Sequence, residues 1–173
     1  EVLDIFLAID GHKEDANILP FLNYDKIKEG KMCRHIVCVL PFKASCDALE
    51  NLLEANKGLF QNLGEYTIVN IAGLTSDAQY PSIQSVKSVI SDCEKKGKKT
   101  ITLTVNRMLT GTTVEEWDTM LYFKDTASPQ EYDQAIFRLQ NQYIKSYRDG
   151  DKVIKFNMKP QTLLVDFDPS RMF

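Results

Sequence analysis

Long hydrophobic runs, cysteine pairs and histidine are scarce in this chain of 173 residues, and each shortage excludes a class of protein. No stretch approaches the roughly 18 apolar residues of a membrane-spanning helix, so we expect no contact with a membrane. The chain begins at Glu1 without a basic leader, so we expect no signal peptide and a cytoplasmic location. It ends at Phe173, directly after a strand-like run, so we expect a piece of a larger protein.

The four cysteines, Cys33, Cys38, Cys46 and Cys93, form no C-x-x-C pair, and the chain has only two histidines. We therefore expect no metal site, and reduced, mostly buried thiols. The net charge of −3 argues against a domain that binds nucleic acid strongly without help. Any DNA contact is expected to be local, or shared with other domains.

Apolar residues follow two patterns along the chain. Short, unbroken runs rich in β-branched residues predict buried strands at 36–40, 66–72, 100–105 and 119–123, with later strands at 153–158 and 162–167. Stripes at helical spacing predict helices over 44–55, from Ser82, and from a capping box at 128–131. Strands that alternate with helices predict an α/β fold, an open and mostly parallel sheet with helices on both faces.

The beginning of the chain is harder to interpret. Residues 2–9 fit either the end of a helix or a strand, and residues 26–31 read as a polar connector. We therefore divide the chain into a poorly defined lead-in, 1–33, and a single domain, 34–173.

In an open parallel sheet the functional residues lie beyond the carboxyl ends of the strands. The segment after strand 100–105 combines polar side chains, from Asn106 onward, with Gly111, which permits close approach of a ligand. Such a segment suits contact with a phosphate or a nucleic-acid backbone. An ordinary connecting loop has the same composition.

The helix after strand 119–123 carries Gln134 and Arg138 one turn apart. An arginine above the strand ends is well placed to bind a phosphate through its planar fork of N–H groups. The alternative is a surface arginine paired with Asp133 or Glu131. Residue types alone leave both interpretations open.

The order of these two segments resembles motifs V and VI of superfamily 2 DNA helicases and translocases of the restriction-enzyme type. Residues 100–119 are similar to motif V, with a Thr110-Gly111 pair after a strand and a Trp117-Asp118 pair before the next. Residues 128–141 are similar to motif VI, in which an arginine follows the glutamine of a Gln-Ala pair by four residues.

The resemblance extends to the neighbouring strands. Residues 34–41 resemble the strand of motif IV, and 165–171 resemble the strand that follows motif VI. The similarity therefore covers 34–171 and implies a RecA-like fold, the second motor domain of such a protein.

The resemblance also implies roles for individual residues. Arg138 would reach the γ-phosphate of ATP held on the other motor domain, and Gln134 would sense the state of the nucleotide. Gly111 and Thr113, in motif V, would line the nucleotide cleft. Asn106 and Thr110 would lie near nucleic acid or at the surface between the two motor domains.

The chain departs from the common helicase pattern at three of these positions. Many helicases carry a second motif VI arginine where this chain has Asn141. Many also carry an aspartate where it has Thr113 and an arginine where it has Thr110. Either Arg138 acts alone, or this branch places its second cation elsewhere.

The sequence contains no G-x-x-x-x-G-K-[ST] phosphate loop and no D-E-x-H or D-E-A-D box. The resemblance therefore implies that ATP and Mg²⁺ bind in a full-length parent, between this domain and a first RecA-like domain, and that the chain alone binds neither and is inactive. The parent would be an ATP-dependent DNA helicase or restriction enzyme acting on double-stranded DNA, with nuclease or methyltransferase domains or subunits. The alternative function is a non-enzymatic α/β interaction module of a DNA-processing complex.

Two further features are interpreted as structural. The lysine cluster at 95–99 precedes a strand, so we expect it at the sheet end opposite the predicted site. Trp117 is expected to pack in the core rather than to stack on a base.

Overall fold

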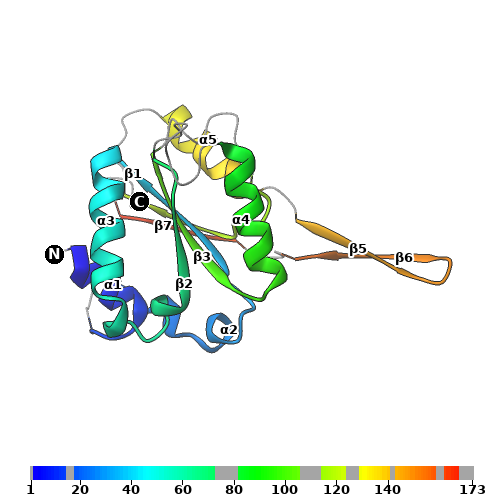
Figure 1. The fold of residues 1–173 in the computed structure, drawn as a ribbon, viewed down its shortest axis with the longest axis horizontal. Helices are drawn as coiled ribbons and strands as arrows, with labels where there is room; N and C mark the ends of the chain where they lie inside the picture. Colours follow the sequence, from blue (N-terminus) through cyan, green and yellow to red (C-terminus); the bar gives the residue numbers. More distant parts are fainter. Residues whose placement is uncertain are drawn as a thin grey trace.

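The computed structural model describes residues 2–14, 18–72, 82–105, 114–123, 129–140, 143–158 and 162–167. Its centre is a five-stranded sheet in which all strands run parallel, in the order β2-β3-β1-β4-β7 (Figure 1). The strands are β1 (His35–Leu40), β2 (Tyr66–Asn70), β3 (Lys99–Val105), β4 (Thr119–Tyr122) and β7 (Leu163–Asp166). A separate antiparallel pair consists of β5 (Ile144–Asp149) and β6 (Lys152–Asn157).

Helices cover both faces of the sheet, and Figure 1 shows α3 and α4 on opposite sides of it. One face is covered by α1 (Val2–Asp10), α2 (Asp25–Lys28) and α3 (Lys43–Ala55). The other face is covered by α4 (Ile83–Lys95) and α5 (Pro129–Leu139). Short 3₁₀ turns lie at Phe21–Asn23, Lys57–Leu59 and Leu63–Glu65.

Strand β1 lies at the centre of the sheet, and all six of its residues are buried. Its Cys38 belongs to the core under α1 and α3, whereas Val37 and Val39 belong to the core under α4. Alternate residues of one strand thus enter two separate cores, which requires an unbroken apolar run. The predicted fold class is confirmed: an open parallel α/β sheet with helices on both faces.

The N-terminal region is more ordered than the sequence indicated. Residues 2–9, which fitted either a helix or a strand, belong to α1, whose Phe6 and Ile9 are almost completely buried. The predicted polar connector at 26–31 was wrong in part, because it includes most of α2 and buries Ile27. These side chains belong to the same apolar core as β1 and α3. The domain boundary at residue 33 stays a prediction.

The late strands also differ from the expectation. β6 confirms the strand predicted at 153–158, but it pairs with β5 outside the main sheet, and β5 was not predicted. The residues of β5 are largely polar and exposed, so the strand lacks the apolar run by which buried strands are recognised. β7 confirms the strand predicted at 162–167 and forms one edge of the sheet.

The predictions for the start of the helix at Ser82 and for the cysteines are confirmed. Ser82 caps α4: its Oγ accepts the backbone N–H of Ser85, whose Oγ in turn accepts the N–H of Ser82. The cap predicted at Ser128 lies outside the described residues. All four cysteines are free, and three of them are buried. Among the helices that the structure describes, none has the length and apolar character to cross a bilayer.

Candidate functional site at the carboxyl edge of the sheet

Strands β3 and β4 end at the same edge of the sheet, on either side of β1. Val105 ends β3 beside Leu40, and Tyr122 ends β4 beside Val39. The two segments that leave these strands therefore start about 10 Å apart, the width of two strand spacings. This is the arrangement predicted for the segment after Val105 and for the helix after β4.

The segment after Val105 holds the residues assigned to motif V. It spans 106–113 and lies outside the residues that the structure describes. The four assigned residues, Asn106, Thr110, Gly111 and Thr113, all belong to it. Their proposed contacts with nucleotide and nucleic acid stay predictions.

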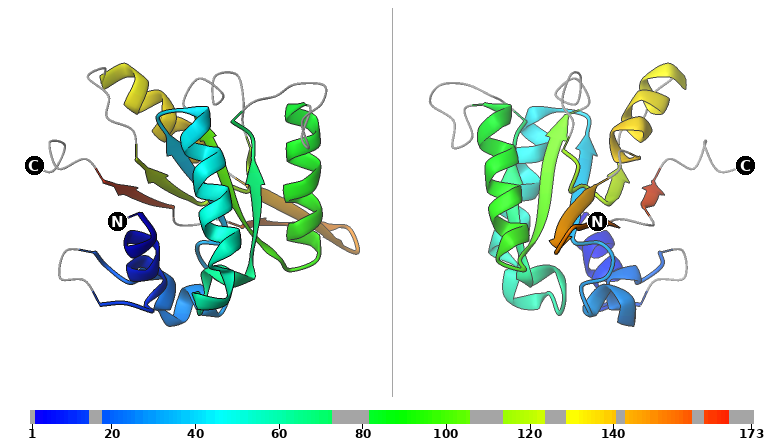
Figure 2. Two further views of the ribbon diagram at one scale, coloured as in Figure 1. Left: turned by 60° about the vertical axis from the view of Figure 1, so that its left-hand side comes forward. Right: turned by 90° about the vertical axis from the view of Figure 1, so that its right-hand side faces the viewer.

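Helix α5 packs against the carboxyl end of β4, above the sheet in Figure 2. Its Tyr132 contacts Tyr122 edge to face, with ring centroids 5.1 Å apart, and Leu139 is buried near the other end of the helix. Gln134 is exposed on this helix, and Arg138 follows one turn later, with a side chain outside the described part of the structure. The fold thus places the predicted motif VI helix at the edge where β3 ends, while the ligand contacts of Gln134 and Arg138 stay predictions.

Apolar side chains are exposed on the segments that follow β1 and β4. Phe42, two residues beyond β1, and Phe137, on α5, each expose 69% of their surface, more than any other large apolar residue among those described. A groove of about 520 Å³ lies between α1 and α3 at the end of β1, lined mainly by apolar side chains such as Leu40, Leu52 and Phe123. Neither Phe42 nor Phe137 is among the residues that line this groove.

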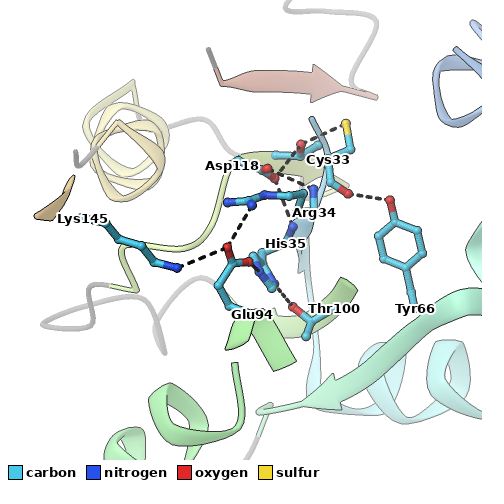
Figure 3. Close-up of polar contacts among 9 residues, drawn as sticks. Cys33, Arg34, His35, Tyr66, Glu94, Thr100, Asp118 and Lys145 are labelled. Atoms are coloured by element: carbon cyan, nitrogen blue, oxygen red, sulfur yellow. Dashed lines mark hydrogen bonds and ion pairs between the residues drawn. The ribbon is translucent and has the colours of Figure 1, made fainter. Parts of the chain in front are cut away.

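A separate polar cluster lies at the opposite, amino-terminal edge of the sheet (Figure 3). His35 begins β1 and is fully buried, with Nε2 2.6 Å from Oε2 of Glu94 and Nδ1 2.9 Å from Oγ1 of Thr100. The other oxygen of Glu94 lies 2.9 Å from Nη1 of Arg34 and 3.9 Å from Nζ of Lys145. Glu94, near the end of α4, therefore contacts His35 of β1 and Lys145 of β5, and His35 in turn links it to Thr100 of β3.

Asp118 joins the start of β4 to the start of β1. Its carboxylate accepts hydrogen bonds from the backbone N–H groups of Arg34, at 3.0 Å, and His35, at 3.2 Å. Trp117 before it is completely buried, and its indole N–H donates to Oγ1 of Thr102 at 3.4 Å. The Trp117-Asp118 pair is therefore structural, which confirms the packing role predicted for Trp117.

Burial and hydrogen bonding shift the pKa values in this cluster in opposite directions. The pKa of Glu94 is lowered, because His35 hydrogen-bonds its carboxylate and Arg34 adds positive charge. The pKa of Asp118 is raised, because burial outweighs the backbone N–H groups that it accepts. Burial also raises the pKa of Cys33 to about 12, which keeps this thiol protonated and unreactive. The cluster is buried and internally satisfied, so we interpret it as structural rather than catalytic.

Sequence reasoning missed the cluster because its members are far apart in the chain. The only signals were charged residues next to strand ends, such as Arg34 before β1 and Asp118 before β4. The lysine cluster at 95–99 was placed correctly, since Lys99 begins β3 at this amino-terminal edge. Its Nζ donates to the carbonyl oxygen of Ile27 at 3.1 Å.

Together, the open parallel sheet and its carboxyl edge define an α/β protein of the kind that binds ligands beyond its strand ends. No protein-family profile matches the sequence. Over 140 residues, 79% of this chain, it is 31% identical to a Mycoplasma pneumoniae protein named the C-terminus of a "putative type II restriction enzyme and methyltransferase". The chain spans 19% of that relative's length. Among solved structures, the C-terminal part of the Fun30 ATPase domain aligns with 86% of this chain and 43% of its own, at a TM-score of 0.43 and 17% identity.

Proposed function

We propose that this chain is the second motor domain of an ATP-dependent DNA helicase or translocase that forms part of a restriction enzyme. The observation that carries the proposal is the edge shared by β3 and β4, which flank β1 in parallel. The motif V-like segment and the motif VI-like helix follow these two strands, so both start where ligands bind in open parallel sheets. This placement is what one wall of a nucleotide cleft requires.

The Mycoplasma relative supports the restriction-enzyme part of the proposal, because its name joins a restriction enzyme with a methyltransferase. The chain matches a fifth of that protein. We therefore place the nuclease, the methyltransferase and the first motor domain outside this chain, in a full-length parent or in its subunits.

The residues of this chain fit one wall of an ATP site and not a complete site. Gln134 and Arg138 lie one turn apart on α5, and together would offer an amide and a guanidinium group to a phosphate. Among the residues that the structure describes, no group of three acidic, histidine or cysteine side chains is placed to hold Mg²⁺. ATP and Mg²⁺ would be held mainly by the first motor domain, and hydrolysis of ATP is the chemistry that they supply.

In this proposal the chain contributes positioning and charge. Arg138 stabilises the negative charge that develops on the transferring phosphoryl group, as arginine fingers do. Gln134 senses whether the γ-phosphate is present. Phe42 and Phe137, both strongly exposed here, become buried against the first motor domain when the cleft closes, which excludes water.

The test is Arg138→Ala in the full-length protein, measured as DNA-stimulated ATP hydrolysis. We expect kcat to fall roughly 10³-fold or more, because the arginine acts on charge that grows in the transition state. The affinity for ATP should change much less. Lys96→Ala is the matched control, since it removes one exposed positive charge at the amino-terminal edge.

Two results would contradict the proposal. A well-folded Arg138→Ala protein with near-normal kcat would remove the catalytic role of Arg138. A full-length protein that hydrolyses no ATP in the presence of DNA would favour the alternative, a non-enzymatic interaction module.

A further inference from the structure

A two-stranded hairpin, β5–β6, projects away from the sheet and its helices (Figure 1). The register pairs Ile144 with Asn157 at the root and Asp149 with Lys152 at the tip, where Gly150 turns with a φ of +61°. All six residues of β6 and five of the six in β5 are exposed. The ribbon is therefore exposed on both faces, and its side chains are accessible to a ligand.

The hairpin carries positive charge in an acidic chain. Residues 144–157 contain four basic and two acidic side chains, so the segment has a net charge of +2 in a chain of −3. Within the part of the chain that the structure describes, Arg148, Lys152 and Lys155 form no ion pair, which leaves their charges available to a ligand. A local cluster of this sign attracts a polyanion, although the whole chain does not.

Apolar and aromatic side chains are interleaved with these cations. Five of the eleven exposed large apolar residues in the described chain lie on the hairpin: Ile144, Tyr147, Val153, Ile154 and Phe156. The rings of Tyr147 and Phe156 lie 5.6 Å apart and are each about half exposed. Directly opposed residues share a face, so the register places both rings on the face that carries Lys145, Asp149 and Lys152. Arg148 and Lys155 lie on the opposite face.

The root of the hairpin is tied to the body of the protein. The backbone N–H of Met158 donates to the carbonyl oxygen of Tyr143 at 2.7 Å, which closes the ribbon. Lys145 lies 3.9 Å from Glu94 of α4 and 5.5 Å from the centre of the Tyr143 ring. Glu94 belongs to the amino-terminal edge of the sheet, so the hairpin leaves the body near the edge opposite the proposed nucleotide cleft.

From these features we infer that the β5–β6 hairpin is a nucleic-acid-binding arm, which holds an unpaired DNA strand. The strand passes around the ribbon: Tyr147 and Phe156 form a platform on which an exposed base stacks, and Lys152 contacts phosphates on that same face. Arg148 and Lys155 contact phosphates on the opposite face. Cations interleaved with aromatic rings are the means by which proteins bind single strands without reading their sequence. The inference rests on the proposed function for its choice of DNA, but it concerns a surface separate from the ATP cleft.

Fluorescence anisotropy of the full-length protein, without nucleotide, tests the arm. The probes are a labelled oligo(dT) of roughly 20 nucleotides and a blunt duplex of the same length. Tyr147→Ala and Phe156→Ala should each weaken binding of the single strand by roughly fivefold or more and change duplex binding little. Tyr147→Phe should bind almost normally, because the ring is kept.

The lysines are tested by Lys152→Gln combined with Lys155→Gln, which keeps both rings and therefore the packing of the hairpin. This variant should weaken binding and lower the salt dependence of the affinity, by about 1.4 in the slope of log K against log salt. The control, Lys96→Gln with Lys98→Gln, changes the charge equally at an exposed turn on the body and should bind as the wild type does.

Equal losses in the hairpin variant and the control would show a non-specific effect of charge and overturn the inference. Unchanged binding in all hairpin variants would also overturn it. Equal effects of the ring variants on duplex and single strand would refute base stacking. Because no ATP is present, these results are independent of the Arg138 test.

Discussion

Tyr132 of α5 meets Tyr122, the last residue of β4, edge to face, with ring centroids 5.1 Å apart and ring planes at 90°. Tyr122 is fully buried, so the contact anchors the helix on a rigid part of the sheet. Gln134 lies two residues after Tyr132 and Arg138 one turn further on. The position of the predicted motif VI residues therefore depends on this pair of rings.

Replacing Tyr132 should affect stability and activity together. Aromatic pairs of this geometry contribute about 0.5–1.5 kcal/mol beyond the burial of their surface. We expect Tyr132→Ala to lower the free energy of unfolding by about 1–3 kcal/mol, measured in urea, and to lower kcat in the full-length protein. Tyr132→Phe keeps the ring and should lose less of both. Full ATPase activity in a destabilised Tyr132→Ala protein would show that the anchor does not position α5 for catalysis.

Arg138→Lys should fail to restore activity in the full-length protein. A lysine keeps the charge but not the planar fork, so kcat should stay close to that of Arg138→Ala. Thermal melting of both variants should resemble the wild type, since an arginine that faces an open cleft, as proposed for Arg138, contributes little to folding. A structural ion pair predicts the inverse: melting temperature falls, while turnover per folded molecule is normal.

The chain alone should hydrolyse no ATP. It lacks the phosphate loop and the acidic box that hold the β- and γ-phosphates and Mg²⁺. We expect phosphate release by the purified 173-residue chain to equal the background, with and without DNA. Turnover that rises with chain concentration would show that the wrong half of the motor has been assigned.

Glu94 should make the protein sensitive to acid. Its pKa in the folded state is lowered by the hydrogen bond to His35 and by Arg34, so its stabilising effect is complete above its ordinary value of 4.5. The effect is lost as the pH falls below that value and the carboxylate takes up a proton. Melting temperatures between about pH 6 and pH 3 should therefore fall more steeply for the wild type than for Glu94→Gln. Parallel curves would show that Glu94 has no such role.

Asp118→Ala should be strongly destabilising. It would leave the buried N–H groups of Arg34 and His35 without their acceptor, at a cost of about 1–3 kcal/mol each. We expect a loss of about 2–4 kcal/mol in the free energy of unfolding, measured by denaturant titration. Turnover per folded molecule should be unchanged, because the cluster lies at the edge opposite the proposed cleft. A selective loss of turnover would instead make Asp118 part of the motor.

The elements of the main sheet were readable from the chain because each carries its own signal. The run Ile36–Leu40 is apolar at every position, and only a strand covered on both faces uses such a run. Ser82 marks the start of α4 by a hydrogen bond to a residue three positions away, which is a local property. Strand β5 of the hairpin has no such signal, because most of its side chains are exposed to solvent and polar, so it shows no run of apolar residues.

For the candidate site, too, some features follow from the sequence and others only from the tertiary structure. The amino-acid order determined that the motif V-like segment follows one strand and the motif VI-like helix another, and that these residue types suit phosphate contact. Only the tertiary structure decided that β1 lies between β3 and β4, which sets the two segments two strand spacings apart along the edge. It also decided that His35, Glu94 and Asp118 form one cluster at the other edge. The physical reason is that hydrogen bonds between strands and the packing of helices connect residues tens of positions apart, and local patterns carry no record of which strand will pair with which.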